Sequence, residues 1–98
     1  MAKPIYKMYL ARPTEAWYRL PKAEQDVLLA KIGNILPQVG AKSVIICSSS
    51  WATEQWVFWG VEEYPDLEAL QRADEMHREL NWYRYVDSMS SVGTAMES

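Results

Sequence analysis

The sequence predicts a single α+β domain whose strands and helices follow the order β-α-β-β-α-β. Two observations lead to this prediction. Four short segments are rich in Val, Ile, Tyr and Trp, which favour strands, and two longer segments are typical of surface helices. The chain has 98 residues, close to the commonest domain length, so a second core is not expected.

The first half of the chain is expected to begin with a strand over residues 4–12, where Ile and two Tyr favour extended backbone and a proline follows. Residues 14–20 are expected to form a turn or one short helical turn. Pro21 then begins a helix over residues 21–39, because proline at the first helical position loses no backbone hydrogen bond.

Two strands follow over residues 43–48 and 56–63, and the short polar gap between them predicts an antiparallel hairpin. Asp66 is a suitable N-cap for a second helix over residues 66–80. The last strand is expected over residues 82–92. This order predicts the ferredoxin-like arrangement, a four-stranded antiparallel sheet with two helices on one face.

Composition argues against several classes of protein. The net charge is −3 without a cluster of Lys and Arg, so nucleic-acid binding is not expected. No apolar run approaches the ~20 residues of a membrane span, and residues 1–4 do not resemble a signal peptide. Cys47 is the single cysteine and cannot form an internal disulfide, so a cytoplasmic location is expected.

The third strand carries apolar residues on both faces, with Trp59 and Val61 on one face and Trp56 and Phe58 on the other. A sheet with one wet face would alternate apolar and polar residues. Two helices cover only one face, so we expect the other face, assigned to Phe58, to pair with a second copy in a symmetric homodimer. The alternative is cover by loops, although no long loop is available.

With this order and length, the chain resembles the dimeric α+β barrel proteins, in which two ferredoxin-like protomers pack sheet on sheet. The resemblance spans residues 4–92 and includes residues 63–69 (Glu-Tyr-Pro-Asp-Leu-Glu-Ala), similar to the strand-to-helix junction common in that family. The family includes cofactor-free oxygenases of the antibiotic-biosynthesis type, lactone isomerases, polyketide cyclases, haem-degrading enzymes and members without known activity. The resemblance therefore implies several functions without selecting one.

His77, the only histidine, is the main catalytic candidate. On a helical wheel it lies beside Ala73 and Leu80 on the apolar face of the second helix, so it points toward the sheet. Two hypotheses follow: a core imidazole satisfied by a carbonyl or a Tyr hydroxyl, or a general acid or base in the cleft between helices and sheet. The resemblance implies that this cleft binds substrate.

Two further residues are candidates for catalysis. Tyr6 is expected to share the helix-facing side with Met8 and Leu10 and to donate a hydrogen bond to a bound oxygen, and a one-residue slip in register would give this role to Tyr9. Arg84 could hold an anionic oxygen while stacking on a neighbouring ring. The alternative for Arg84 is an ordinary surface or dimer ion pair.

Aromatic residues that carry a polar edge are in excess, with five Trp and six Tyr against one Phe. Such rings gather in ligand pockets and interfaces because their N–H and O–H groups need partners. The candidates for substrate binding are Trp17, Trp51, Trp59 and Tyr85. The alternative for these rings is plain core and interface packing.

No metal site is expected, because one His and one Cys at distant positions do not supply the ligands of a zinc site. No nucleotide-binding motif is present. Haem is a minor alternative: His77 resembles the axial His of the haem-degrading members, but these carry an Asn on the first strand, where residues 6–9 here are Tyr, Lys, Met and Tyr.

The leading hypothesis is a homodimer that binds a small aromatic or apolar molecule without a bound cofactor. Proton transfer by His77 would suit an isomerase, cyclase, lyase or oxygenase. The main alternative is a non-catalytic ligand-binding or assembly domain.

Overall fold

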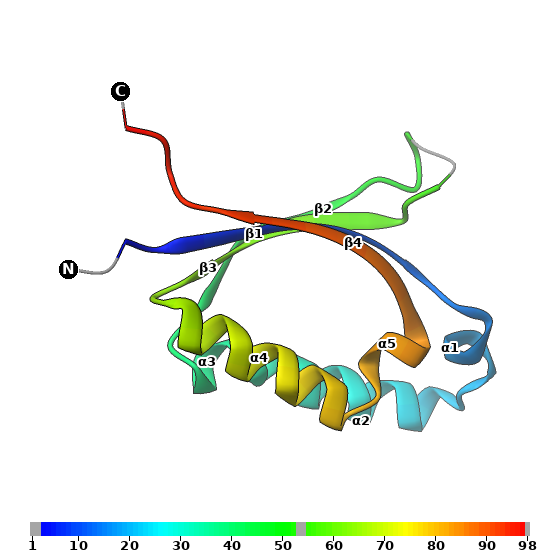
Figure 1. The fold of residues 1–98 in the computed structure, drawn as a ribbon. Coiled ribbons are helices and arrows are strands. Elements are labelled where there is room, and N and C mark those ends of the chain that lie inside the picture. Colours follow the sequence, from blue (N-terminus) through cyan, green and yellow to red (C-terminus); the bar gives the residue numbers. More distant parts are fainter. Residues whose placement is uncertain (1–2, 53–54, 98) are drawn as a thin grey trace.

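The computed structural model describes residues 3–52 and 55–97. A four-stranded antiparallel sheet forms one layer, and the helices form a second layer against one of its faces (Figure 1). In chain order the elements are β1 (Ile5–Pro13), α1 (Glu15–Arg19), α2 (Lys22–Gly33), α3 (Ile35–Gln38), β2 (Lys42–Ser48), β3 (Phe58–Tyr64), α4 (Leu67–Glu79), α5 (Trp82–Tyr85) and β4 (Val86–Gly93).

The strands lie in the order β2-β3-β1-β4, so β1 and β3 are central and the expected ferredoxin-like topology is confirmed. In β1, Lys7 lies opposite Glu62 of β3 and Val92 of β4. Because directly opposed residues of antiparallel strands point to the same face, the odd-numbered residues of β1 share a face with the even-numbered residues of β3 and β4.

Three of the predicted elements differ from the structure. The first four residues of the expected strand over 82–92 form the helix α5, so β4 begins only at Val86. Asn81, just before α5, has φ 55°, in the left-handed region that Asn tolerates better than most residues. The chain therefore turns sharply between α4 and α5, and the first ring of α5 then packs edge-on against the ring of Trp17.

The expected helix over residues 21–39 is divided at Asn34 into α2 and α3. Gly33 and Asn34 are weak helix formers, and Pro37 has no N–H to donate to the carbonyl of Gly33, so a continuous helix is disfavoured here. The third strand begins at Phe58, two residues later than expected.

The densest packing lies near the start of β1, where α3 and α4 cross the sheet. Its centre consists of the buried side chains of Ile35, Tyr64, Ala69 and Ala73. Tyr64 is fully buried, and its hydroxyl donates a hydrogen bond of 2.7 Å to Oε1 of Glu62. Burial and this bond raise the pKa of Tyr64 far above 10, so the phenol stays protonated.

On the other face of the sheet lies no helix formed by residues 3–52 or 55–97 (Figure 1). Its register positions include Met8 of β1, Ile45 of β2 and Met89 of β4, whose exposed fractions are 46%, 48% and 60%. Trp59 lies on this open face, whereas Phe58 lies on the helix side. The expectation that Phe58 belongs to the open face is therefore wrong, because the alternation of β3 runs in the opposite phase. Among the described residues, no helix is long and apolar enough to cross a membrane.

Candidate functional site

A cavity of about 470 Å³ lies between the sheet and the helix layer, farther along β1 than the packed core. It is lined by side chains from most elements of the fold. These are Lys7, Tyr9, Ala11, Pro13, Trp17, Leu29, Ile32, Gly33, Leu36, Ser43, Ile46, Phe58, Glu62, His77, Trp82, Tyr83, Val86 and Ser88.

The cavity follows β1, because four alternate residues of this strand line it from Lys7 to Pro13. With a rise of about 3.3 Å per residue, these positions span about 20 Å. Lys7 and its cross-strand partner Glu62 place charge at one end. Trp17 lies at the other end, together with Val86, the cross-strand partner of Pro13. The cavity is therefore polar at one end and aromatic at the other.

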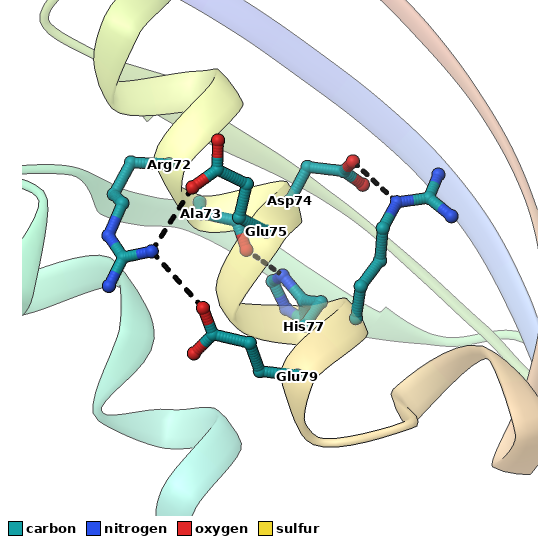
Figure 2. Close-up of polar contacts among 7 residues, drawn as sticks. Arg72, Ala73, Asp74, Glu75, His77 and Glu79 are labelled. Atoms are coloured by element: carbon teal, nitrogen blue, oxygen red, sulfur yellow. Dashed lines mark hydrogen bonds and ion pairs between the residues drawn. The ribbon is translucent and has the colours of Figure 1, made fainter.

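His77 lines the cavity from α4 and is half-buried. Figure 2 shows its ring turned back along the helix, with Nδ1 2.7 Å from the carbonyl oxygen of Ala73. A carbonyl oxygen can only accept, so Nδ1 carries the proton and Nε2 holds the lone pair of the neutral ring. Burial is the main cause that lowers the pKa of His77 below 6.5, so the ring is neutral at pH 7.

Charged groups from three elements act on His77. Glu62 of β3 and Asp74 of α4 raise its pKa, Lys7 of β1 lowers it, and the hydrogen bond to Ala73 raises it. Desolvation is the largest of the contributions, so the pKa of His77 is lowered overall. His77 is thus a neutral imidazole whose remaining lone pair can accept a proton.

Tyr83 is held beside His77 by a network on α4. Its hydroxyl donates to Oδ1 of Asp74 at 2.9 Å, and Nε of Arg78 contacts Oδ2 of the same carboxylate at 2.8 Å. The ion pairs of Arg72 lie on another side of the helix (Figure 2). The guanidinium of Arg78 also lies over the Tyr83 ring, whose centroid is 6.2 Å from that of His77. Tyr83 therefore forms a fixed wall, with its hydroxyl already engaged.

Tyr9 supplies a hydroxyl with no such partner. It forms no hydrogen bond with any residue in 3–52 or 55–97, and its ring packs edge-on against Phe58. Burial, and then the charge of Glu62, raise the pKa of Tyr9 to about 12, so it is a proton donor at neutral pH. The ring lies over Gly60: a Cβ there would be 2.6 Å from the Tyr9 hydroxyl oxygen. Only glycine leaves room for this position of the ring.

Tyr6 points to the open face of the sheet and lies outside the cavity. Its hydroxyl donates to Oε1 of Glu63 at 2.8 Å, and this bond raises its pKa. The expectation that Tyr6 faces the helices is therefore wrong by one residue, and Tyr9 occupies that side instead.

The remaining candidates are scattered. Trp17 lines the aromatic end of the cavity, and its ring centroid is 6.0 Å from Trp82 and 6.3 Å from Tyr85. Tyr85 belongs to two surface hollows beyond this cluster. Arg84 is exposed on the outer side of α5, where it lines one of these hollows.

The other two tryptophans do not reach the cavity. Trp51 is 84% exposed in the loop after β2, and Trp59 lies on the open face. Of the seven residues singled out from the sequence, His77 and Trp17 therefore meet at the cavity. Whether either acts on a ligand stays a prediction.

Sequence reasoning missed Lys7, Glu62, Trp82 and Tyr83 as cavity residues. A charged residue within an apolar strand was a usable signal for the first two. Trp82 and Tyr83 are expected in a strand on propensity, whereas the structure places them on a turn of helix beside His77. No group of three or more His, Cys, Asp or Glu side chains comes together as a metal site in the described parts of the chain.

A scan against family models and a search of curated proteins find no match for the sequence. Solved structures do match in fold. RPA0582, a protein of unknown function from Rhodopseudomonas palustris, is 20% identical with a TM-score of 0.69, and the match covers 98% of this chain and 85% of that chain.

Two other solved structures also match in fold at low sequence identity. TA0507, provisionally named a chlorite dismutase, is 17% identical with a TM-score of 0.74; the match covers 99% of this chain and 47% of that chain. SnoaB, a cofactor-independent oxygenase from Streptomyces nogalater, is 13% identical with a TM-score of 0.57, and the match covers 99% of this chain and 97% of SnoaB. These similarities support the ferredoxin-like α+β fold that the sequence predicted.

Proposed function

We propose that this protein binds a small aromatic or otherwise apolar molecule in the cavity and removes a proton from it with His77, without a bound cofactor. The observation that supports this most directly is the contact of 2.7 Å between Nδ1 of His77 and the carbonyl of Ala73. It fixes the tautomer in which Nε2 is the base, on a ring that lines a cavity.

In this mechanism Nε2 takes the proton from a carbon next to a carbonyl group, and the electrons of the broken C–H bond form the enolate. The lowered pKa of His77 keeps the ring in its basic form at pH 7. Negative charge then develops on the ligand oxygen, where a hydrogen bond from Tyr9 stabilises it. Tyr9 suits this role because its hydroxyl has no hydrogen bond within the described chain and remains protonated at neutral pH.

Such a step is common to isomerases, cyclases, lyases and cofactor-free oxygenases. The similarity of fold to SnoaB favours the last class, although it is similarity of fold alone. The aromatic end of the cavity, with Trp17 and Trp82, supports a flat ring as the part of the ligand that lies deepest.

We also propose that the protein works as a homodimer through the open face of the sheet. Met8, Ile45 and Met89 are exposed on that face, and nothing in the described chain covers them. A face-to-face contact between two copies would remove this apolar surface from water.

The test uses 2-tetralone, a flat aromatic ketone with an acidic C–H beside its carbonyl. Exchange of that hydrogen in heavy water is followed by proton NMR. We expect the parent to accelerate exchange above the buffer rate. In His77→Gln the enzymatic rate should fall by a factor of about 10²–10⁴. Tyr9→Phe should retain partial activity, and Arg84→Gln, outside the cavity, is the matched control that should behave as the parent does.

Three outcomes separate the alternatives. Exchange that depends on His77 supports the enzyme. Binding of 2-tetralone without exchange, seen as a rise in the melting temperature, supports a non-catalytic binding domain. If 2-tetralone neither binds to the protein nor undergoes exchange, the proposed function is contradicted.

A further inference from the structure

Lys7 is a cation at the polar end of the cavity that forms no ion pair within 4 Å of any described residue. It is half-buried and borders two hollows, the cavity itself and a surface depression between β4 and α4. Lys7 therefore lies where the cavity adjoins a surface depression, which we call the mouth of the cavity.

The carboxylates that surround Lys7 contact other groups. Glu62, directly opposite on β3, accepts the hydroxyl of Tyr64 at 2.7 Å, and because this donor is neutral the carboxylate keeps its negative charge. Asp74 on α4 holds Arg78 at 2.8 Å, and Glu75 on the same helix is 3.1 Å from a nitrogen of Arg72. The lining residues on β4 at this point, Ser90 and Val92, are neutral. Asp74 and Glu75 are thus paired with arginines, and the one carboxylate among the described residues left to oppose Lys7 at this end of the cavity is Glu62, which forms no ion pair with it.

From this arrangement we infer that the ligand is an aromatic carboxylate, with its ring in the aromatic end of the cavity and its carboxylate at the mouth beside Lys7. An anion at a mouth keeps part of its hydration, so the desolvation that penalises buried charges is small. Its ring meanwhile removes apolar surface from water deep in the cavity. This inference rests on the ligand binding proposed above and narrows the ligand to a charged class.

The charge of the whole molecule makes the inference testable. The protein carries a net charge of −3, so its overall field repels anions. A preference for an anionic ligand over its neutral counterpart must therefore come from a local cation. Lys22, which lies on α2 and is 81% exposed, offers a matched control, because its replacement changes the net charge equally without reaching the cavity.

The experiment compares 1-pyrenebutanoate with 1-pyrenebutanol, which share the ring and chain and differ in the charge of the end group. Dissociation constants are measured by pyrene fluorescence at low salt. We expect the parent and Lys22→Gln to bind the carboxylate about five- to tenfold more tightly than the alcohol. In Lys7→Gln the two constants should agree within about twofold, with binding of the alcohol unchanged.

Glu62→Gln should increase the preference for the carboxylate, because it removes a negative charge opposite Lys7. In the parent, a change from 0.05 to about 1 M salt should abolish most of the preference, since the screening length falls to about 3 Å. This salt dependence gives a second measurement if a Lys7 variant does not fold.

Equal binding of both probes by the parent, or a preference that persists in Lys7→Gln, overturns the inference and leaves the proposed cavity binding intact. If neither probe binds, both the inference and the proposed function are contradicted. Trp17→Leu should weaken both probes by a similar factor, which would place the pyrene ring at the aromatic end.

Discussion

The replacement of His77 by Ala should separate function from stability. In a packed core, loss of the imidazole would leave a void and an unpaired acceptor, which together destabilise a protein by about 2–4 kcal/mol. In this structure the ring borders a cavity of about 470 Å³, so its loss enlarges an existing space and most of the void contribution disappears.

The acceptor also keeps a partner. The carbonyl of Ala73 lies four residues before His77 within α4, so it accepts the backbone N–H of residue 77 whichever side chain is present. The variant loses one side-chain hydrogen bond, about 1 kcal/mol, and gains roughly 0.5 kcal/mol because Ala is the better helix former. We therefore expect the free energy of unfolding to fall by less than about 1 kcal/mol.

Urea denaturation of the parent, His77→Ala and His77→Gln gives the measurement, alongside the exchange of 2-tetralone. Both variants should lose the exchange activity while their denaturation midpoints stay close to that of the parent. A loss above 2 kcal/mol in His77→Ala that His77→Gln restores would refute this reasoning. It would show that the imidazole is a structural hydrogen-bonding group and would remove the basis for a catalytic role.

Other changes test separate parts of the structure. Gly60→Ala should destabilise the fold by about 1–3 kcal/mol in urea denaturation, because a Cβ there would lie 2.6 Å from the Tyr9 hydroxyl oxygen and 2.7 Å from the carbonyl oxygen of Ile45; an unchanged midpoint would contradict both close approaches. Because the pKa of His77 is lowered in the folded protein, the unfolded chain binds more protons than the folded protein just below pH 6.5. The free energy of unfolding should therefore keep its full value above that pH and decline as the pH falls through the folded pKa. His77→Gln should lose less stability than the parent between pH 7.5 and 5.5, and equal losses would contradict the shift. Met8→Glu places a charge on the open face, so sedimentation should change from twice the 11.3 kDa chain mass to the chain mass itself, with the circular dichroism preserved; a parent that is already monomeric would exclude the dimer. The purified protein should show no Soret absorption, whereas a stoichiometric haem would favour the alternative in which His77 is an axial ligand.

The sequence was sufficient for the order of elements because strand-forming runs and helical segments are local signals. It was insufficient at residues 82–85, where the rings favour a strand on propensity. In the structure Asn81 adopts a left-handed conformation, and the packing of Trp82 against Trp17 accompanies a helical turn. Long-range packing of this kind overrides local preference, and no short-range pattern reports it.

The register of β1 was misjudged for a related reason. Placing the large apolar residues Met8 and Leu10 under the helices follows the rule that apolar side chains face a packed core. In the structure Lys7, Tyr9 and Ala11 face the helices instead, because that part of the interior is a cavity. The rule fails where a cavity replaces a core.

His77, in contrast, could be identified from the sequence, because a lone imidazole on an apolar helix face is conspicuous in any arrangement of strands. Glu62 is marked in the sequence only as a charge within an apolar strand, because the face on which it lies depends on the phase of β3 relative to β1, which the alternation of that strand does not determine. The main candidate was thus accessible to sequence reasoning, whereas most of its surroundings were not.

The interior is packed at one end of the sheet and hollow at the other, and this difference affects the motions of the helix layer. No residue of α2 is buried, whereas α4 contributes Ala69 and Ala73 to the packed centre. Segments with few buried contacts open locally at a lower free energy than the rest of a protein, so the backbone amides of α2 should exchange with deuterium well before those of α4. A molecule bound in the cavity would contact Leu29 and Ile32 and would oppose the local opening of α2. Slower amide exchange in α2 would then report cavity occupancy directly, even for a ligand that undergoes no reaction.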